Sequence, residues 1–213
     1  MPRPKITNVI AASINGLIAN HKHESDSQRS LFQLTNSTDQ KHVAKMMATS
    51  DAIITGANSL RSESKLRTEL GLGGKCPTWI IFTTKGISKD HAFWTQNQIK
   101  RVLVSPSKIE NHNKDVIHLV AKNKSSVDTV LDYLTDNAYE HALLFGGGQV
   151  NQMFYEKQMV DELVLTTSPV LFQSEDSVNI LPKSIKPISF ELLSVNSDES
   201  GNVYSAYQVT NKN

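Results

Sequence analysis

The sequence has little of several features that would assign its class directly. Its 213 residues include one cysteine, Cys76, so no disulfide can form within the chain, and we expect a cytoplasmic protein. Charge is nearly balanced, with 22 Lys and Arg against 21 Asp and Glu, which argues against nucleic acid or an anionic membrane as the partner. No apolar stretch approaches the roughly 20 residues that cross a bilayer, and the apolar segment near the N-terminus is too short for a secretory signal. We therefore expect a small-molecule substrate.

Common catalytic signatures are absent as well. No G-x-G-x-x-G follows the first apolar run and no G-x-x-x-x-G-K-[ST] occurs, so neither the Rossmann nor the P-loop fingerprint is present. No serine stands in a nucleophile-elbow pattern, which argues against a hydrolase. His21, His23 and Glu24 have ligand chemistry but no further ligands at useful spacing, so we expect no metal site.

Short β-branched and apolar runs, each bounded by polar residues, predict buried strands. They cover residues 6–10, 52–55, 79–83, 102–104, 116–120 and 142–145. Apolar spacing of about 3.6 residues predicts three crossover helices between them, around residues 43–47, 127–134 and 150–154. Ser37 with Gln40, and Ser125 with Asp128, have the spacing of capping pairs at the starts of two of these helices.

The C-terminal part is rich in strands again, at residues 162–167, 190–195 and 203–209. Residues 200–202 predict a hairpin turn between the last two. The pattern indicates an α/β fold with three layers: a mixed, mainly parallel sheet flanked by helices, with a C-terminal antiparallel hairpin. We expect a single domain over residues 1–213, with surface loops at residues 20–37 and 61–75 bordering a site. Four apolar residues of the hairpin are expected to join the core rather than an interface: Phe190, Leu192, Tyr204 and Tyr207.

A glycine triplet is the most informative segment of the chain. The apolar run at residues 142–145 leads directly into three glycines, and an amphipathic helix follows. Glycines allow a ligand to approach the backbone closely, and a helix start offers unpaired N–H groups to a phosphate. A tight turn alone would need only one glycine, so we predict a phosphate site. The predicted cofactor residues in this segment are Gly146, Gly147, Gly148, Gln149 and Val150.

Glycine and small polar residues also stand at the ends of the predicted strands at residues 52–55 and 79–83. Such ends at the carboxyl edge of one parallel sheet predict an extended ligand, such as a dinucleotide. Lys85 would bind the 2′-phosphate that distinguishes NADPH from NADH, although its spacing fits a solvated lysine in a turn equally well. The predicted cofactor residues at these two ends are Thr55, Gly56, Ala57, Asn58, Ser59, Thr83, Thr84 and Lys85.

Together these segments resemble the reductase family of the riboflavin pathway, which occurs alone and as the C-terminal half of a bifunctional deaminase–reductase. The matching stretches are residues 3–7, 12–19, 50–60, 144–150, 160–165 and 168–171. The glycine triplet followed by Val160, Asp161, Glu162 and Leu163 is the most specific match. The resemblance implies a dihydrofolate-reductase-like fold, NADPH as cofactor, a homodimer, and reduction of 5-amino-6-(5-phosphoribosylamino)uracil or a related small pyrimidine. The zinc deaminase half does not occur in this sequence.

The sequence departs from that family where the family usually places polar contacts to the substrate. A Ser-Leu-Asp-Gly-Lys stretch appears here as Ser-Ile-Asn-Gly-Leu at residues 13–17, and an Asp-Asp-Pro as Ser-Glu-Ser at residues 62–64. The Glu before the glycine triplet is replaced by Phe145, and the Asp at the end of the third strand by Thr83. By position, the resemblance makes five residues candidates for substrate binding: Ser13, Asn15, Ser62, Glu63 and Phe145. No residue stands out as a general acid.

Two other functions stay open from the sequence. A dihydrofolate reductase would use an acidic residue on its first helix, and Asp39 is the nearest candidate, although at a helix start it also simply complements the helix dipole. A nucleotide-binding protein without catalysis would keep the dinucleotide groove and lose the substrate site. Binding of NADPH without its oxidation by pyrimidine, pterin or carbonyl compounds would identify that second alternative.

Overall fold

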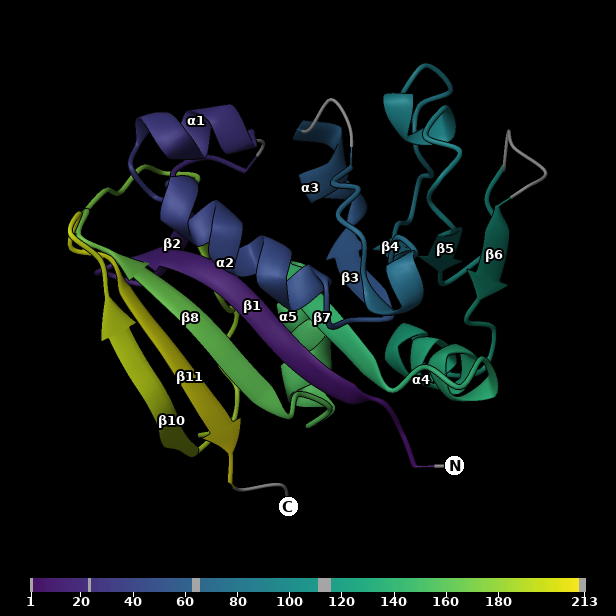
Figure 1. Ribbon diagram of the computed structural model, residues 1–213. Helices are drawn as coiled ribbons and strands as arrows, with labels where there is room; N and C mark the ends of the chain where they lie inside the picture. The colour runs from purple at the N-terminus through teal and green to yellow at the C-terminus, as the bar shows by residue number, and fades with distance from the viewer. Residues whose placement is uncertain (1, 23, 63–65, 111–115, 211–213) are drawn as a thin grey trace.

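The computed structural model describes residues 2–22, 24–62, 66–110 and 116–210. Nine strands form one sheet in the order β10-β11-β8-β1-β7-β3-β4-β5-β6 (Figure 1). Their bounds are β1 Lys5–Ser13, β3 Ala52–Gly56, β4 Thr78–Phe82, β5 Arg101–Ser105, β6 Ile117–Val120, β7 His141–Gly146, β8 Glu162–Ser168, β10 Phe190–Ser197 and β11 Val203–Val209. The helices are α1 Asp26–Leu31, α2 Ser37–Met47, α3 Ala57–Ser62, α4 Ser126–Asp136 and α5 Gly148–Glu156, with 3-10 turns η1 Leu72–Gly74 and η2 Ala92–Trp94.

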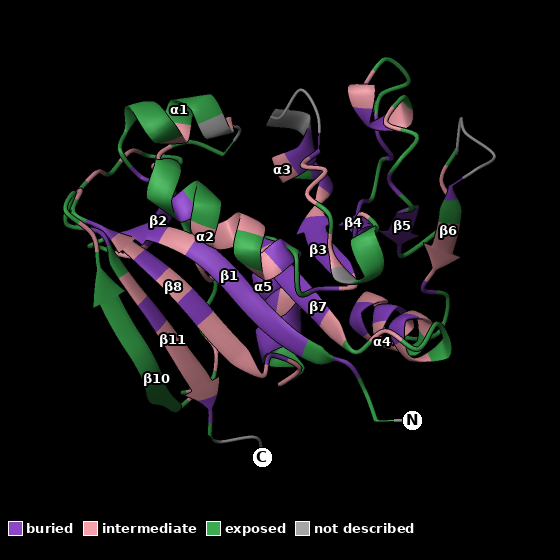
Figure 2. Ribbon diagram, in the orientation of Figure 1, coloured by how far each residue is buried: buried purple, intermediate pink, exposed green. Residues whose placement is uncertain are grey.

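The direction of the strands confirms the predicted mixed, mainly parallel sheet. All neighbours from β8 through β1 to β6 run parallel. Strand β11 joins β8 antiparallel and continues the sheet into the β10–β11 hairpin. The central strands are almost continuous apolar runs because both of their faces are covered by helices (Figure 2).

Adjacent residues of one strand contact different helices, which shows the three layers directly. Ile53 of β3 packs in a cluster with Met47 of α2 and Leu60 of α3. Its neighbour Ile54 points to the other face and packs in a cluster that includes Val130 of α4. Both isoleucines are fully buried, and burial of such a side chain contributes roughly 1.5 to 3 kcal/mol. The alternation places α2 and α3 together on one face of the sheet.

The helix caps are partly as predicted. Ser125 caps α4, because its Oγ accepts the Asp128 N–H at 3.1 Å. The prediction that Ser37 caps the second helix is wrong. Asn36 is the cap, and its side-chain oxygen accepts the Asp39 N–H at 2.8 Å. Asparagine and serine cap equally well, so spacing alone did not separate two neighbouring candidates.

Short elements lie in segments where the sequence shows little periodicity. The predicted loop at residues 20–37 contains α1, whose capping box joins Ser25 and Gln28 through hydrogen bonds between side chain and backbone in both directions. Strands β2 (Leu17–Ala19) and β9 (Val178–Asn179) form a separate two-stranded sheet. The described part of the predicted loop at residues 61–75 is irregular apart from the end of α3 and η1.

The predicted turn between the last two strands is confirmed. Gly201 has a φ of +85°, and the Asp198 carboxylate accepts the backbone N–H groups of Ser200 and Asn202 at 2.9 and 3.1 Å. The Ser200 and Tyr204 hydroxyls also donate to Asp198. These hydrogen bonds hold the pKa of the Asp198 carboxyl well below its usual range.

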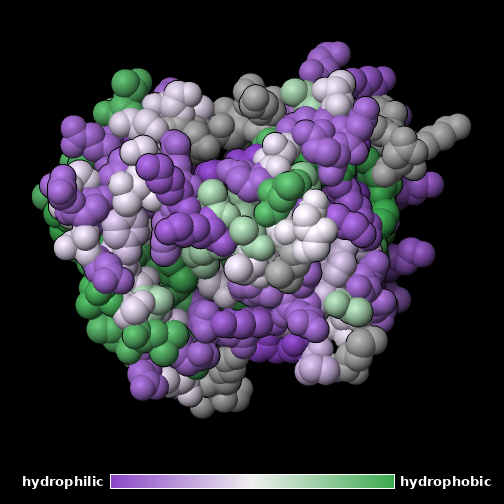
Figure 3. All heavy atoms as spheres, in the orientation of Figure 1, coloured by the Kyte–Doolittle hydropathy of each residue, from purple (hydrophilic) through white to green (hydrophobic). Residues whose placement is uncertain are grey.

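Strand β10 is the outer edge of the sheet and is exposed along its whole length (Figure 2). Leu192, Leu193 and Val195 are each more than half exposed, and hydrophobic residues gather at the lower left in Figure 3, where β10 lies. The expectation that Phe190 and Leu192 belong to the core is therefore wrong. Helix α2 reaches the neighbouring strand β11, where the rings of His42 and Tyr204 lie 5.5 Å apart, and α5 lies over the central strands.

Candidate functional site

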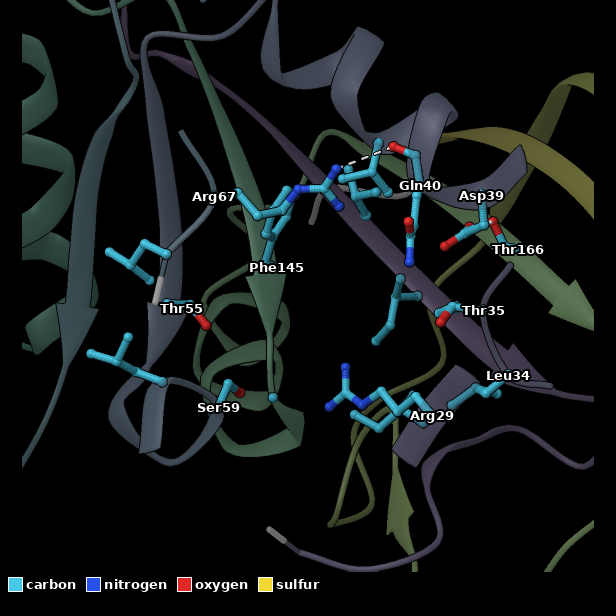
Figure 4. A pocket seen from close by; sticks show the side chains of 18 of the residues that line it. Arg29, Leu34, Thr35, Asp39, Gln40, Thr55, Ser59, Arg67, Phe145 and Thr166 are labelled. Atoms are coloured by element: carbon cyan, nitrogen blue, oxygen red, sulfur yellow. Dashed lines mark hydrogen bonds between the residues drawn. The ribbon is translucent and has the colours of Figure 1, made fainter. Parts of the chain in front are cut away.

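A cavity of about 180 Å³ lies on the α2 face of the sheet and reaches the carboxyl ends of β3 and β7 (Figure 4). Helices α1, α2 and α3 border it. Its apolar walls include Val43, Leu60, Leu66, Trp79 and Phe145. Its polar lining consists of Arg29, Thr35, Asp39, Gln40, Thr55, Ser59, Arg67 and Thr166. Apolar walls with a few convergent polar groups are typical of a small-molecule site.

The glycine triplet forms the end of β7 and the start of α5, and all three glycines are required. Gly146 and Gly147 have positive φ values of +74° and +32°, and a Cβ on Gly146 would overlap the Asn151 side chain. A Cβ on Gly148 would lie 2.7 Å from the Asn179 carbonyl oxygen. Gly147 caps this nine-residue helix without a side-chain hydrogen bond, so the helix start keeps backbone donors for a ligand. We call Gly146, Gly147 and Gly148 the glycine cradle.

Thr55 and Ser59 bring the end of β3 to the glycine cradle. Thr55 Oγ1 donates to the Gly146 carbonyl at 3.2 Å, which ties the two strand ends together. A Cβ on Gly147 would lie 3.4 Å from Ser59 Oγ, so this hydroxyl faces the cradle directly. Thr55, Ser59 and Gly147 all line the cavity. The structure therefore brings together the two strand ends that the sequence predicted separately.

The five other predicted cofactor residues near these ends have different surroundings. Ala57 and Val150 are buried in the core. Gly56 leaves room for Val150, since a Cβ there would lie 3.1 Å from Val150 Cγ2. Asn58 and Gln149 are exposed on the first turns of α3 and α5. None of these residues lines the cavity.

The third predicted strand end lies beside the second but outside the cavity. Because β3 and β4 pair in parallel up to Phe82, the turn after β4 lies directly next to the end of β3. Thr83 is buried, and its Oγ1 donates to the Gly86 carbonyl at 3.2 Å, so it shapes the turn. Thr84 and Lys85 are exposed. Only a ligand that extends past the end of β3 would reach Lys85.

Ser13 and Asn15, both predicted to bind the substrate, lie at the turn between β1 and β2 and outside the cavity. The Ser13 hydroxyl donates to Asn15 Oδ1 at 2.7 Å and accepts the Leu17 N–H at 3.0 Å. The Asn15 side-chain nitrogen donates to the Phe172 carbonyl at 3.0 Å. These hydrogen bonds hold the turn and tie it to Phe172, and neither Ser13 nor Asn15 lines the cavity.

The remaining substrate candidates differ in position. Phe145 lines the cavity and packs against Trp79. Ser62 is the last residue of α3, and Glu63 lies outside the described residues. Phe145 gives the cavity a flat apolar wall, against which a planar ring packs well.

Asp39 makes a hydrogen bond to a distant strand that the sequence did not predict. Its carboxylate does more than complement the dipole of α2, because its Oδ1 accepts the Thr166 hydroxyl of β8 at 2.8 Å. Asp39 is 5% exposed and Thr166 is 4% exposed, and both line the cavity. The two residues are 127 positions apart in the sequence, so no local pattern indicated the pair.

Two arginines reach the cavity from segments predicted to be loops. Arg67 donates to the Glu69 carboxylate at 2.8 Å and to the Gln40 carbonyl at 3.3 Å. In Figure 4 the guanidinium of Arg29, which belongs to α1, points into the cavity. Arg29 lies in the short helix α1 and Arg67 in an irregular segment, and neither segment shows an apolar periodicity from which these residues could have been predicted.

Among the residues that the structure describes, no group of three His, Cys, Asp or Glu side chains is arranged to hold a metal ion. His23 lies outside the described residues, and Glu24 is buried and accepts the Asn20 N–H at 3.1 Å. None of the described helices has the length and apolar character that a membrane crossing needs.

Comparison with known proteins identifies the family. Residues 4–204 match the family model described as the RibD C-terminal domain. The chain belongs to this family. The match covers most of the chain and confirms the resemblance to the riboflavin-pathway reductases.

Individual relatives agree with this assignment. The chain is 23% identical over 185 residues to a 2,5-diamino-6-ribosylamino-4(3H)-pyrimidinone 5′-phosphate reductase from Aquifex aeolicus, covering 83% of this chain and 81% of that protein. The fold is shared with a pyrimidine reductase-like protein from Corynebacterium diphtheriae, with a TM-score of 0.79, 17% identity and coverage of 98% and 93%. It is also shared with a diaminohydroxyphosphoribosylaminopyrimidine deaminase/5-amino-6-(5-phosphoribosylamino)uracil reductase from Thermotoga maritima, with a TM-score of 0.80 and 18% identity. The chain is covered to 98% in that match but spans 57% of the Thermotoga chain.

Proposed function

We propose that this chain is an NADPH-dependent reductase of the riboflavin pathway, which transfers a hydride to a phosphoribosylaminopyrimidine. The glycine cradle at the start of α5, opening onto a cavity with an aromatic wall, carries the proposal. Membership of the RibD C-terminal domain family and the name of the Aquifex relative support it.

The residues of the cradle fit a dinucleotide phosphate. Gly147 lines the cavity without a side chain to cover its backbone, and the Ser59 hydroxyl faces it. The start of α5 supplies backbone N–H groups and a partial positive charge to a phosphate. Lys85, exposed beside the end of β3, would bind the 2′-phosphate of NADPH, with Thr84 next to it. When bound, this cofactor supplies a hydride to the substrate.

The residues of the cavity position the substrate and exclude water. Phe145 and Trp79 form one wall, and Val43, Leu60 and Leu66 complete the apolar lining. Hydride transfer requires little from the protein beyond alignment of the two reacting carbons in a dry pocket. We propose Phe145 as a substrate contact, whereas Ser13 and Asn15 serve the β1–β2 turn.

Calorimetric titration with NADPH and then NADH is the first test. We expect NADPH to bind more tightly. The NADPH complex is then mixed with 5-amino-6-(5-phosphoribosylamino)uracil and with its 2-amino counterpart, and NADPH absorbance is followed. Saturable oxidation with either pyrimidine supports the proposal. Tight NADPH binding without oxidation by either would contradict it. If pterin and carbonyl compounds also fail to oxidise the bound NADPH, the chain is a nucleotide-binding protein without catalysis.

We further propose that residues 1–213 act as one reductase domain, in the cytoplasm and as a homodimer. The exposed apolar strand β10 supports a second copy of the chain as its partner, because an uncovered apolar edge strand favours association. Sedimentation of a Leu193→Lys variant tests the dimer, and Leu171→Lys, at an exposed position outside β10, is the control. We expect only Leu193→Lys to sediment as a monomer.

A further inference from the structure

We propose that Asn151 is a positioning residue for cofactor binding, which holds the glycine cradle in the conformation that receives the dinucleotide phosphate. The inference rests on the reductase function proposed above and adds to it a residue that acts from behind the cradle. Asn151 is fully buried in α5, which packs on the face of the sheet opposite to α2 and the cavity. It acts through Gly146, the first glycine of the cradle.

The side chain of Asn151 lies directly against Gly146. A Cβ on Gly146 would lie 2.8 Å from Asn151 Cγ, so no larger residue fits at position 146 while the asparagine is there. Gly146 has a φ of +74°, and a glycine is free to leave this conformation unless its surroundings hold it. From β3, the Thr55 hydroxyl donates to the Gly146 carbonyl at 3.2 Å. Gly146 is therefore held by Asn151 on one side and by Thr55 on the other.

A buried network fixes the orientation of the Asn151 amide. Its Oδ1 accepts from Asn8 Nδ2 of β1 at 3.2 Å, and the same nitrogen donates to the Leu144 carbonyl of β7 at 2.8 Å. The Tyr155 hydroxyl, one turn further along α5, donates to Asn8 Oδ1 at 3.1 Å. Asn8 and Tyr155 are both buried, so any lost hydrogen bond would leave a polar atom unpaired away from water. The network therefore favours a single orientation of the amide.

The other end of the Asn151 amide reaches the segment that follows β9. Its nitrogen donates to the Ile180 carbonyl at 3.3 Å. The neighbouring Asn179 lies against the last glycine of the cradle, since a Cβ on Gly148 would lie 2.7 Å from the Asn179 carbonyl oxygen. One side chain thus connects β1, the cradle and the end of the two-stranded sheet.

The pairing of β7 with β3 shows why this junction needs support from outside the sheet. Ile54 of β3 pairs with Leu144 of β7. The next residue, Thr55, pairs with Gly146, so β7 carries one extra residue here. Such a bulge interrupts the regular ladder of hydrogen bonds, and contacts such as that of Asn151 then fix the backbone. A cradle that is already ordered binds a phosphate more tightly, because its ordering does not oppose binding.

Asn151→Ala tests this role, because it removes the contact with Gly146 and both hydrogen bonds of the amide. We expect NADPH affinity in calorimetric titration to fall roughly tenfold and KM for NADPH to rise to match. We expect kcat, and KM for 5-amino-6-(5-phosphoribosylamino)uracil, to stay nearly unchanged, whereas a general loosening of the fold would raise both KM values. Phosphorus NMR of bound NADP⁺ gives a second readout. The diphosphate resonances should move in the variant, and the 2′-phosphate resonance should not.

Gln152→Ala is the matched control. Gln152 is the next residue of α5 and is also buried, and its amide donates to the Glu156 carboxylate and accepts the Lys183 N–H. We expect thermal melting to show a loss of stability in this variant and titration to show unchanged NADPH affinity. An equal loss of NADPH affinity in the two variants would overturn the inference. Unchanged NADPH affinity in folded Asn151→Ala would overturn it as well.

Tyr155→Phe tests the network by a milder change if Asn151→Ala does not fold. It removes the hydroxyl that donates to Asn8 and keeps the ring in the core. We expect NADPH affinity to fall about two- to threefold. Tyr139→Phe is its control, since the Tyr139 hydroxyl bonds to Thr78 at the start of β4, at the other end of the strands. Equal NADPH affinities in folded Tyr155→Phe and in Tyr139→Phe would contradict the inference.

The inference and the proposed function fail in different ways. If the unmodified protein binds no NADPH, both fail. If it binds NADPH and oxidises it with the pyrimidine, and Asn151→Ala binds NADPH equally tightly, only the inference fails. Weaker NADPH binding by Asn151→Ala, together with no oxidation by the unmodified protein, supports the inference and contradicts the reductase function.

Discussion

The ring of Trp79 meets the ring of Phe145 edge-on, with centroids 6.1 Å apart and planes at 83°. This geometry fixes Phe145 on the wall of the cavity and leaves its ring available to a planar ligand. Phe145→Ala should weaken binding of the pyrimidine phosphate roughly tenfold, because a stacked ring is worth about 1 kcal/mol beyond its buried area. Titration of the NADPH-saturated variant with the pyrimidine measures this loss.

Phe190→Ala is a matched control for Phe145→Ala. Phe190 also makes an edge-on pair, with Tyr207 at 6.2 Å, but it lies on β10 and outside the cavity. We expect pyrimidine affinity to be unchanged in this variant. Equal affinity losses in the two variants would show that a general loosening of the fold, rather than the wall of the cavity, explains the effect.

Gly147→Asp should lower NADPH affinity at least tenfold, because it puts bulk and negative charge where the phosphate is proposed to lie. Gly73→Asp is the control, since Gly73 also has a positive φ and a Cβ there would meet no atom within 4 Å. Calorimetric titration of both variants, with thermal melting to confirm folding, separates the local effect from backbone strain. Unchanged affinity in folded Gly147→Asp would remove the phosphate role of the cradle.

Lys85→Ala should weaken NADPH binding roughly tenfold and leave NADH binding almost unchanged. The reason is that only NADPH has the 2′-phosphate proposed to contact this exposed lysine. Lys89→Ala removes an exposed charge a few residues further on and should affect neither cofactor. If Lys85→Ala weakened both cofactors equally, the lysine would have no part in the choice between them.

Asp198→Asn should lower the melting temperature at neutral pH and change its pH dependence. Hydrogen bonds from Ser200, Tyr204, Asn36 and Asn202 keep the pKa of this carboxyl below its unfolded value, so its contribution to stability is present above about pH 4. That contribution is lost as pH falls further toward the folded pKa. Thermal melts of both proteins between neutral and acidic pH should therefore converge on the acidic side. A constant difference at every pH would contradict the assignment.

The parts of this molecule that could be predicted from sequence are those with local signals. Strands such as β3 and β4 are apolar runs covered on both faces, so their existence and the mainly parallel sheet could be predicted from the sequence, whereas the order of the strands could not. The glycine triplet indicated the position of the cradle, because glycine is the residue that most readily adopts the positive φ values found at Gly146 and Gly147. Both signals are contained within a few neighbouring residues.

The parts that could not be predicted depend on contacts between distant segments. Asp39 meets Thr166 only because α2 packs across β1 and β8, and no spacing near either residue encodes that contact. Ser13 and Asn15 show a different case, since their side chains bond to each other and Asn15 also donates to the distant Phe172 carbonyl. A polar side chain in a stretch that binds the ligand in related proteins also hydrogen-bonds to groups of its own protein. These groups compete with a ligand for the side chain.

Among the residues that the structure describes, strand β10 has a hydrogen-bonded neighbour on one side only, strand β11. In an antiparallel pair every second backbone N–H points away from the partner strand, so half of the amides of β10 face outward. In an isolated chain these outward amides would exchange with deuterium almost as fast as in an unfolded peptide, whereas the inward ones would be protected. Amide exchange along this one strand therefore records directly whether another backbone lies against it in solution.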